Sequence, residues 1–371
     1  MSLVGVTRIA EGEKNEDGAK NGDRQLCPLA SGVRGFAKIV APGTEKSVPI
    51  FRGVVNSRIS AMGLQAIMSA MGPVAELHLH LEGSVEVETF LELDPALTRE
   101  EIARATAYID FEGFIQSYIW VNKKLQSPGH YALAARRLFE RLAAEGVVYA
   151  EVTISAGVIL WKQQDFLPIY EAVQREACLS KIRVRWILDA TRQFGVHAAK
   201  PVFDLAAELV NQGVVAIGLG GFEGGGPARW YADLFKEARD RGLRLVCHAG
   251  ETTDAGSVWE ALEIGAERIG HGIRAIDDPL LVAHLKEKNI PLEICITSNV
   301  RTGAVGSMKD HPVRRLYDAG VPIILNTDDP ALFGCTLTSE YEVARREFGF
   351  TEEEIEGLVR NSFSFAFDGG R

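Results

Sequence analysis

Two histidines stand two positions apart at the end of an apolar run in the segment AELHLHLEGS, residues 75–84. They are His78 and His80, in a chain of 371 residues that has only eight histidines. In a β-strand, residues i and i+2 point to the same side of the sheet, so both imidazoles would face one space. A metal site, a polar patch in the interior and a chance pairing are all compatible with this spacing.

Other side chains suited to metal binding and proton transfer follow other short apolar runs. His248 and Glu251 stand in CHAGE, His271 stands in RIGHGI, and Asp328 and Asp329 stand in NTDDP. Zinc favours His nitrogen and carboxylate oxygen, and a catalytic zinc keeps one position for water. Three imidazoles and one carboxylate fit one such ion per chain, and these are His78, His80, His248 and Asp328.

A metal-bound water also needs a group that takes its proton and a group that protonates the leaving side. Glu251 and His271 remain for these two steps, and Asp328 belongs to the catalytic set as well as to the ligands. We therefore predict metal-assisted hydrolysis. A polar interior without metal is the alternative.

Eight short β-rich runs, alternating with amphipathic helical patterns, would position these groups. The runs are AELHLHL (from residue 75), VVYAEVTIS (147–155), VRWILDAT (184–191), VVAIGLGG (214–221), LRLVCHAGE (243–251), RIGHGI (268–273), IPLEICITS (290–298) and VPIILNTDD (321–329). Strand–helix alternation implies parallel pairing, and eight units predict an α/β fold, a (β/α)8 TIM-type barrel with functional groups at the C-terminal strand ends. An open doubly wound sheet is the alternative.

Two segments stand apart from the eight units. The insertion between the first two runs, roughly residues 84–146, is too long for one crossover helix, and we expect extra helices over the barrel mouth. In residues 1–70 the stretch GEKNEDGAKNGDRQ is polar and periodicity is weak throughout, and we expect a poorly packed N-terminal extension, with an organelle-targeting arm as the alternative. Residues 71–371 would form a single barrel domain.

Composition narrows the class of protein. Hydrophobic content of 46% and charged content of 24% are typical of a soluble globular protein, and no stretch approaches the roughly 18 apolar residues of a membrane span. The net charge of -10 argues against nucleic acid or an acidic membrane as the main partner. Five scattered cysteines without a C-x-x-C pair predict reduced, buried thiols and a cytoplasmic location.

Five motifs in a fixed order carry a resemblance to a known family. AELHLHLEGS, CHAGE, RIGHGI, CITSNVRTGAV and NTDDP resemble the adenosine deaminase family, over roughly residues 75–367. The resemblance implies a (β/α)8 barrel with one zinc on the four ligands above. It also implies that the 6-amino group of a purine is replaced by oxygen, with release of ammonia.

The resemblance implies roles for individual residues. Glu251 would protonate purine N1, and His271 would orient and deprotonate the zinc-bound water. Asp329 would accept a hydrogen bond at N7, with a helix cap before Pro330 as its alternative.

The glycine-rich segment GLGGFEGGG is not a dinucleotide loop, because Glu223 stands where the last glycine of G-x-G-x-x-G is needed. By resemblance, Gly221 would offer its backbone N–H to purine N3. Plain turn geometry is the alternative for these glycines.

Two further residues bear on the substrate. Family members acting on adenosine have HLDG, whose Asp meets the ribose, and this chain has Glu82 in HLEG, which also resembles adenine deaminases and aminodeoxyfutalosine deaminases. SNVRTGAV favours a nucleoside, either adenosine or an adenosine-like compound such as aminodeoxyfutalosine, over free adenine. Arg192, in DATRQFG, would pair with a distal carboxylate of the substrate, or else form a surface salt bridge or a strand-end cap.

The expected partner is a free small-molecule purine nucleoside. The chain has no match to the H-x-E…P-C-x-x-C signature of deaminases that act on polynucleotides. A catalytically silent nucleoside-binding barrel is the alternative from another class, and the presence of both Glu251 and His271 argues against it.

Overall fold

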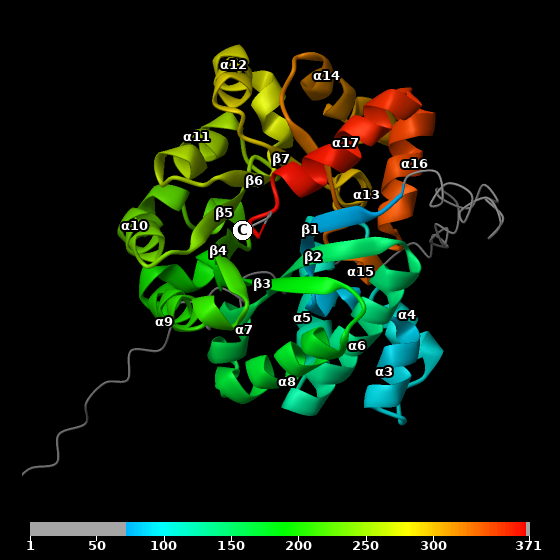
Figure 1. The fold of residues 1–371 in the computed structure, drawn as a ribbon. Helices are drawn as coiled ribbons and strands as arrows, with labels where there is room; N and C mark the ends of the chain where they lie inside the picture. The colour runs from blue at the N-terminus through cyan, green and yellow to red at the C-terminus, as the bar shows by residue number, and fades with distance from the viewer. Residues whose placement is uncertain (1–71, 369–371) are drawn as a thin grey trace, which may run out of the picture. The chain divides into compact units, whose positions relative to one another are not determined.

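The computed structural model describes residues 72–368, which form a barrel of eight parallel strands, each hydrogen-bonded to the next in chain order (Figure 1). The predicted (β/α)8 fold is confirmed. The extension predicted for residues 1–70 lies outside the described residues. The strands are β1 (Val74–His80), β2 (Val147–Ile154), β3 (Arg183–Thr191), β4 (Val214–Gly220), β5 (Arg244–Ala249), β6 (Arg268–His271), β7 (Leu292–Ile294) and β8 (Ile323–Leu325).

Helices surround the strands and fill the predicted insertion. The insertion between β1 and β2 contains α3 (Val87–Leu93), α4 (Arg99–Ala105), α5 (Phe111–Lys124) and α6 (Pro128–Ala144). The remaining α-helices are α7 (Ala156–Trp161), α8 (Phe166–Leu179), α9 (Gly195–Glu208), α10 (Ala232–Asp240), α11 (Ala255–Glu263), α12 (Pro279–Lys288), α13 (Ile296–Arg301), α14 (Val313–Asp318), α15 (Pro330–Phe333), α16 (Leu337–Phe348) and α17 (Glu352–Ser364).

Side-chain caps fix where three of the four insertion helices begin. Thr98 and Glu101 form a capping box at α4, and the Asp110 side chain caps α5. The Ser127 side chain caps α6. The first residue of α6 is Pro128, which has no N–H and therefore leaves no donor unpaired at the start of the helix. The insertion is therefore broken into separate helices by its own sequence.

The seam between β1 and β8 closes the barrel beside the candidate ligands. The two segments meet through a bridge between Leu79 and Asp328. Asn326 Oδ1 accepts hydrogen bonds from the N–H groups of Leu77 and His78 at 2.8 and 3.0 Å. For these two N–H groups a side-chain amide takes the place of a main-chain carbonyl. Asp328 has a left-handed backbone with φ of 66°, a strained conformation for a non-glycine residue that is frequent at functional sites.

The last two strands are shorter than predicted. The predicted runs extend to residues 298 and 329, whereas β7 ends at Ile294 and β8 ends at Leu325. The β-branched residues Ile296 and Thr297 instead begin α13. Tertiary contacts override local preference here, because the helix brings the Ser298 hydroxyl to 2.6 Å from Asp328 Oδ2.

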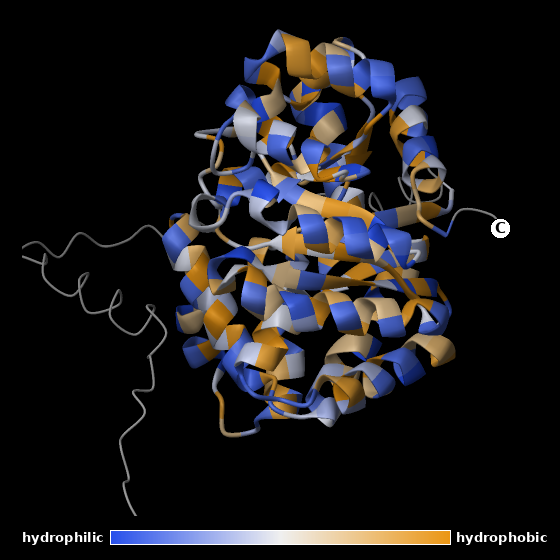
Figure 2. Cartoon of the chain, turned by 90° about the vertical axis from the view of Figure 1, so that its left-hand side faces the viewer, coloured by the Kyte–Doolittle hydropathy of each residue, from blue (hydrophilic) through white to orange (hydrophobic). Residues whose placement is uncertain are grey.

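Apolar side chains pack outside and inside the barrel. Figure 2 shows apolar strands covered by helices with mixed apolar and polar faces. Inside, two smaller clusters face the barrel axis, one of Ala75, Leu77, Tyr149 and Ile324 and one of Ile187, Ala216 and Val246.

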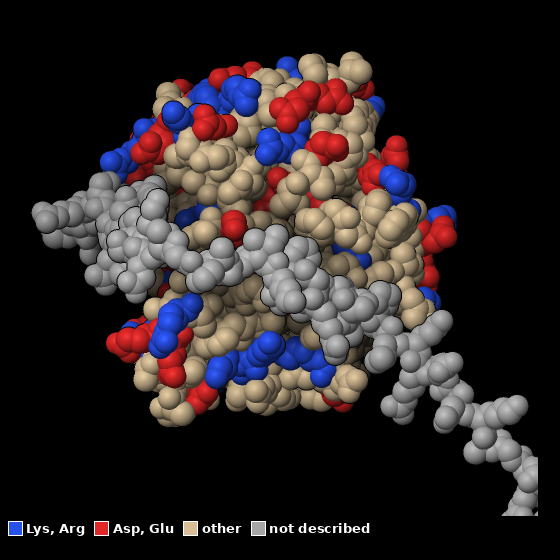
Figure 3. All heavy atoms as spheres, turned by 180° about the vertical axis from the view of Figure 1, so that it is seen from behind, with Lys and Arg blue, Asp and Glu red and all other residues tan. Residues whose placement is uncertain are grey.

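The face of the molecule in Figure 3 carries charges of both signs, and three of the four described cysteines are buried as predicted. Figure 3 shows acidic and basic side chains interspersed on the face in view. Cys247, Cys295 and Cys335 are buried free thiols, but the predicted burial is wrong for Cys178, which lies on the solvent side of α8. Within residues 72–368, no helix has the length and apolar character needed to cross a membrane.

Candidate metal centre and active site

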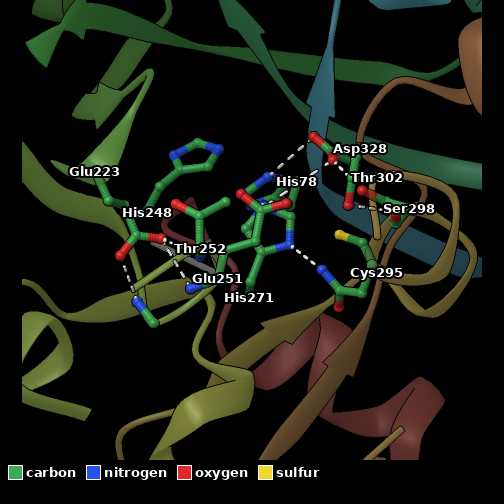
Figure 4. Close-up of polar contacts among 12 residues, drawn as sticks. His78, Glu223, His248, Glu251, Thr252, His271, Cys295, Ser298, Thr302 and Asp328 are labelled. Carbon is green, nitrogen blue, oxygen red and sulfur yellow. Dashed lines mark hydrogen bonds and ion pairs between the residues drawn. The ribbon is translucent and has the colours of Figure 1, made fainter. Parts of the chain in front are cut away.

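Imidazoles and a carboxylate converge at the C-terminal ends of the strands. Candidate ligand atoms of His78, His248, His271 and Asp328 lie within 4.8 Å of one another (Figure 4). His80 reaches the same group, since its Nε2 lies 3.3 Å from Asp328 Oδ1 and its ring centroid lies 5.4 Å from that of His248. The structure therefore brings together all four predicted ligands and His271, and a set of three imidazoles and one carboxylate here could bind a metal.

The surroundings of His78 suit a cation. Its Nδ1 lies 2.7 Å from Glu293 Oε2, whereas its buried Nε2 has no hydrogen-bond partner and lies 3.5 Å from Asp328 Oδ1. Burial disfavours the protonated ring, but contacts with Asp328 and Glu293 outweigh burial and raise the pKa of His78 to about 10. A metal ion near Nε2 would take the place of that proton, and a carboxylate behind the other ring nitrogen is the usual support of a metal-binding histidine.

Burial keeps two other imidazoles neutral. The pKa of His248 falls well below its ordinary value because the ring is buried and lies beside other imidazoles, His78 first among them. Burial also lowers the pKa of His271 to about 4. Near pH 7 both rings are therefore neutral, and a neutral ring nitrogen can bind a metal or exchange a proton.

A chain of hydrogen bonds sets which nitrogen of His271 carries the proton. The backbone N–H of Val313 donates to His311 Nδ1 at 3.2 Å, so the neutral His311 ring has its proton on Nε2. That Nε2 lies 3.1 Å from Asn299 Oδ1, and Asn299 Nδ2 lies 3.0 Å from His271 Nδ1. Burial lowers the pKa of His311 to about 3, which keeps the ring neutral. Because Asn299 donates to Nδ1, the His271 proton sits on Nε2, toward the carboxyl groups of the site.

Glu251 and Asp328 are two acids with opposite protonation. Burial, reinforced by the Asp328 charge, raises the pKa of Glu251 well above its ordinary value. Burial acts in the same direction on Asp328, but the close His78 and His80 imidazoles outweigh it and hold the pKa of Asp328 well below its ordinary value. His271 Nε2 lies between them, 3.8 Å from Glu251 Oε2 and 3.9 Å from Asp328 Oδ2. A protonated acid beside an ionised one is the arrangement that acid–base catalysis requires.

Glu223, which follows β4 in the glycine-rich segment, holds the Glu251 loop in place. Its carboxylate accepts hydrogen bonds from the N–H groups of Gly250 at 2.9 Å, Glu251 at 2.8 Å and Thr252 at 3.0 Å, and from two hydroxyl groups. Figure 4 shows Glu223 and Asp328 on opposite sides of Glu251 and His271. Burial opposes ionisation, but these hydrogen bonds outweigh it and lower the pKa of Glu223. Sequence analysis missed this role of Glu223. The only signal for it in the sequence is an acidic residue among glycines directly after a strand.

Asp329 presents an unpartnered buried oxygen to the site. The residue is 3% exposed, and its Oδ1 has no hydrogen-bond partner. Burial and the Asp328 charge raise the pKa of Asp329 well above its ordinary value. The side chain makes no capping hydrogen bond to α15, so the helix-cap alternative does not explain it. Gly83 makes room for it, because a Cβ there would lie 1.7 Å from Asp329 Oδ1.

Glu82 is buried and tied to the insertion. Its Oε1 accepts from the Ser155 N–H at 3.1 Å, and its Oε2 accepts from the Tyr118 hydroxyl at 3.3 Å. The Tyr118 and Ser155 hydroxyl oxygens are 2.7 Å apart. Burial raises the pKa of Glu82. Tyr118, on α5, is a site residue that sequence reasoning missed, and the aromatic residues of that helix were its only signal.

Arg192 is buried and held by backbone carbonyls. Its side chain is 1% exposed, NH1 donates to the Gly226 carbonyl at 3.0 Å, and NH2 contacts the His248 carbonyl. The guanidinium is therefore occupied by backbone carbonyls after β4 and at the end of β5. Pairing with a distal substrate carboxylate and a surface salt bridge both disagree with this position, and a strand-end cap is the predicted role closest to it.

Gly221 has a backbone conformation and a close neighbour that leave room only for glycine. Its φ is 87°, and a Cβ there would lie 2.3 Å from Gln193 Oε1. Gln193 Oε1 also accepts the next N–H, that of Phe222, at 3.1 Å. Turn geometry accounts for these glycine features without a ligand, and the contact with a purine stays a prediction.

Asp189 on β3 is a further acid that sequence reasoning missed. Burial raises the pKa of Asp189 to about 7, and its Oδ1 has no partner. A Cβ at Gly218 would lie 2.6 Å from that oxygen, so glycine leaves room for it. Asp189 lines an internal cavity of about 10 Å³ together with His78 and His248, which is room for about one water molecule. The signal for Asp189 in the sequence is an acidic residue within the apolar run VRWILDAT.

Comparison with known proteins agrees with this geometry. The model of the family described as adenosine deaminase matches residues 73–369. The chain is 37% identical to the aminodeoxyfutalosine deaminase of Streptomyces avermitilis, covering 80% of this chain and 86% of that protein. It is 34% identical to the adenosine deaminase of Erwinia tasmaniensis, covering 80% and 94%. The crystal structure of adenine deaminase from Arthrobacter aurescens superposes with a TM-score of 0.74 at 29% identity, covering 80% and 94%. The chain belongs to the adenosine deaminase family and is a hydrolytic deaminase.

Proposed function

We propose that this enzyme catalyses zinc-dependent deamination of a 6-aminopurine nucleoside to the 6-oxo product and ammonia. The observation that carries the proposal is a buried Glu251 carboxyl group, whose pKa burial raises, 3.8 Å from His271 beside the imidazole–carboxylate centre. An aromatic amine leaves readily only after its ring has been made electrophilic, and a proton delivered to N1 has this effect.

We assign one zinc ion to His78, His80, His248 and Asp328. Nitrogen and carboxylate donors in this ratio suit zinc, and the ion supplies a hydroxide near neutral pH when it is bound. His271 is left outside the ligand set because its Nδ1 is engaged by Asn299 and its Nε2 carries a proton. A protonated ring nitrogen has no lone pair to offer a metal.

Glu251 and His271 divide the proton transfers. Glu251 donates its proton to N1 as C6 accepts the attacking oxygen. His271 holds that oxygen through its Nε2–H, whereas the resemblance implied a deprotonating role that this tautomer does not favour. Glu251, now ionised, then takes the proton of the new C6 hydroxyl group and passes it to the amine as the C6–N bond breaks and the 6-oxo group forms. Ammonia leaves, and Glu251 regains its starting proton from the water molecule that replaces the consumed hydroxide.

Asp329, Gly221 and Glu82 would recognise the rest of the nucleoside. The raised pKa of Asp329 makes it a hydrogen-bond donor to the lone pair of N7. The acceptor role expected from sequence would need a proton that N7 does not carry. Gly221 would donate its N–H to N3, and Glu82 would stand near the ribose.

The substrate is proposed to be adenosine or an adenosine-like nucleoside such as aminodeoxyfutalosine, in the cytoplasm, with free adenine as the alternative. Relatives named for the two nucleosides are 37% and 34% identical to this chain. Buried free thiols at Cys247, Cys295 and Cys335 suit a reducing compartment.

A side-by-side measurement of kcat/KM for adenosine, adenine and aminodeoxyfutalosine tests the substrate. One nucleoside should exceed adenine by at least about tenfold, because sugar contacts add binding energy in the transition state. Zinc-loaded protein that leaves all three compounds unchanged would contradict the proposal and favour a catalytically silent nucleoside-binding barrel.

A further inference from the structure

The last described residues turn inward and cover the floor of the barrel, the end opposite the candidate metal centre. We call residues Phe365–Phe367 the floor segment. Figure 1 shows the chain after α17 turning in among the strands. Phe365 and Ala366 pack on the inner cluster that contains Tyr149, and Phe367 packs on the inner cluster that contains Ile187. The floor segment is therefore part of the interior packing of the barrel.

The floor segment also surrounds the guanidinium of Arg268, a buried residue of β6. The Phe365 carbonyl accepts from Arg268 NH1 at 2.9 Å, and the Phe367 ring centroid lies 3.7 Å from the guanidinium carbon. The Phe367 N–H donates to Glu151 Oε1 at 2.6 Å, and Glu151 Oε2 lies 2.6 Å from Arg268 NH2. A carbonyl, an aromatic face and a shared carboxylate thus hold one cation.

Arg268 connects this floor to the metal centre. Its Nε lies 2.6 Å from Glu293 Oε1, an ion pair rather than a well-aligned hydrogen bond, and Glu293 Oε2 lies 2.7 Å from His78 Nδ1. The guanidinium is a rigid planar fork, so its position determines where the Glu293 carboxylate can lie. The carboxylate in turn orients the imidazole.

We propose that the floor segment is a positioning element for the metal centre. It fixes Arg268, Arg268 fixes Glu293, and Glu293 fixes the His78 ring so that Nε2 faces the ion. Phe367 touches neither the substrate nor the ion, and is a positioning residue. The inference rests on the metal site assigned in the proposed function.

The test compares Phe367→Ala with Phe363→Ala in the full-length, zinc-loaded enzyme. Phe363 is 37% exposed on α17, so it is a matched phenylalanine at the same end of the chain. Zinc release to a chelator should be about tenfold faster in Phe367→Ala. Its kcat should fall with KM unchanged, because the purine-binding groups lie at the other end of the barrel. Phe363→Ala should match the wild type in both measurements.

Phe367→Leu decides the matter where Phe367→Ala fails to fold. Leucine keeps an apolar side chain on the floor but removes the aromatic face above the guanidinium, so zinc release should still be faster than in the wild type. Wild-type zinc release in either folded variant overturns the proposal. A wild-type enzyme that binds no zinc overturns the proposed metal site instead, so the two failures are distinguishable.

Discussion

The two ends of the barrel treat buried charge in opposite ways. At the floor, Arg268 lies 2.6 Å from carboxylate oxygens of both Glu151 and Glu293, under the ring of Phe367. At the mouth, buried atoms such as Asp329 Oδ1 have no partner, and Glu251 keeps its proton. Paired charge at one end contrasts with unpaired polar groups at the other.

The difference separates charges that hold the structure from charges that await a ligand. A buried polar group without a partner costs about 1–3 kcal/mol, and such groups gather where a ligand completes them. Removal of one partner of a buried ion pair strongly destabilises the fold, because the other charge is left buried without compensation. Substitutions at the mouth should therefore change turnover without loss of stability, and substitutions at the floor should reduce stability as well as disturb the metal centre.

Glu251→Gln should give the largest effect. The amide matches the protonated acid in size but has no proton to give N1, so kcat should fall by about 10²–10⁴-fold. The free energy of unfolding and the zinc content should stay at wild-type values, since the native side chain is already uncharged. Steady-state kinetics, urea denaturation and metal analysis measure the three quantities. Wild-type turnover would refute the acid assignment.

Arg268→Gln, at the floor, should reduce the stability that Glu251→Gln leaves intact. Two buried carboxylates would remain without their cation, and the free energy of unfolding should fall by about 3–5 kcal/mol. Urea denaturation measures this loss, with Glu251→Gln as the control from the mouth. A variant as stable as the wild type would break the proposed contrast between the two ends.

Asn299→Asp should reverse the tautomer of His271 without adding or removing a heavy atom. A carboxylate cannot donate to Nδ1, so the ring proton should move to Nδ1 and leave Nε2 bare. We expect kcat to fall by about tenfold or more, while zinc content and KM hold. Nitrogen chemical shifts of the His271 ring report the tautomer. An unchanged tautomer would contradict the role assigned to His311 and Asn299.

Glu340 on α16 gives the smallest effect, a change in the pH dependence of stability. Burial raises its pKa from 4.5 to about 7. Between these values the folded state holds a proton that the unfolded state has lost, so the free energy of unfolding falls as pH rises through that window. The Glu340→Gln side chain has no such proton to lose. The stability of this variant relative to the wild type should therefore be greater at pH 8 than at about pH 4. Urea denaturation at both values tests the sign, and an equal difference at both would contradict it.

The site groups were predictable wherever they end a strand. His78, His80, His248 and His271 each close a short apolar run, and a parallel barrel brings such ends together. The supporting groups depend on closure of the barrel instead. Glu293 meets His78 across 215 positions of sequence, and local patterns give no signal for a contact so distant.

Side-chain direction was the other limit of the sequence. Arg192 follows β3 as predicted, but its guanidinium folds back onto the His248 carbonyl. The floor segment also escaped prediction, because an apolar run such as FSFAF at the end of a helix fits many surfaces equally well. Strand spacing therefore predicts where the chemistry lies, and only packing reveals what holds it.

The most direct test of the central claim measures zinc and turnover on the same preparation. Purified enzyme should contain one zinc per chain, lose deamination when a chelator removes the ion, and recover both when zinc is returned. Metal-free protein that deaminates at the full rate, or two ions per chain, would contradict a single centre built from His78, His80, His248 and Asp328.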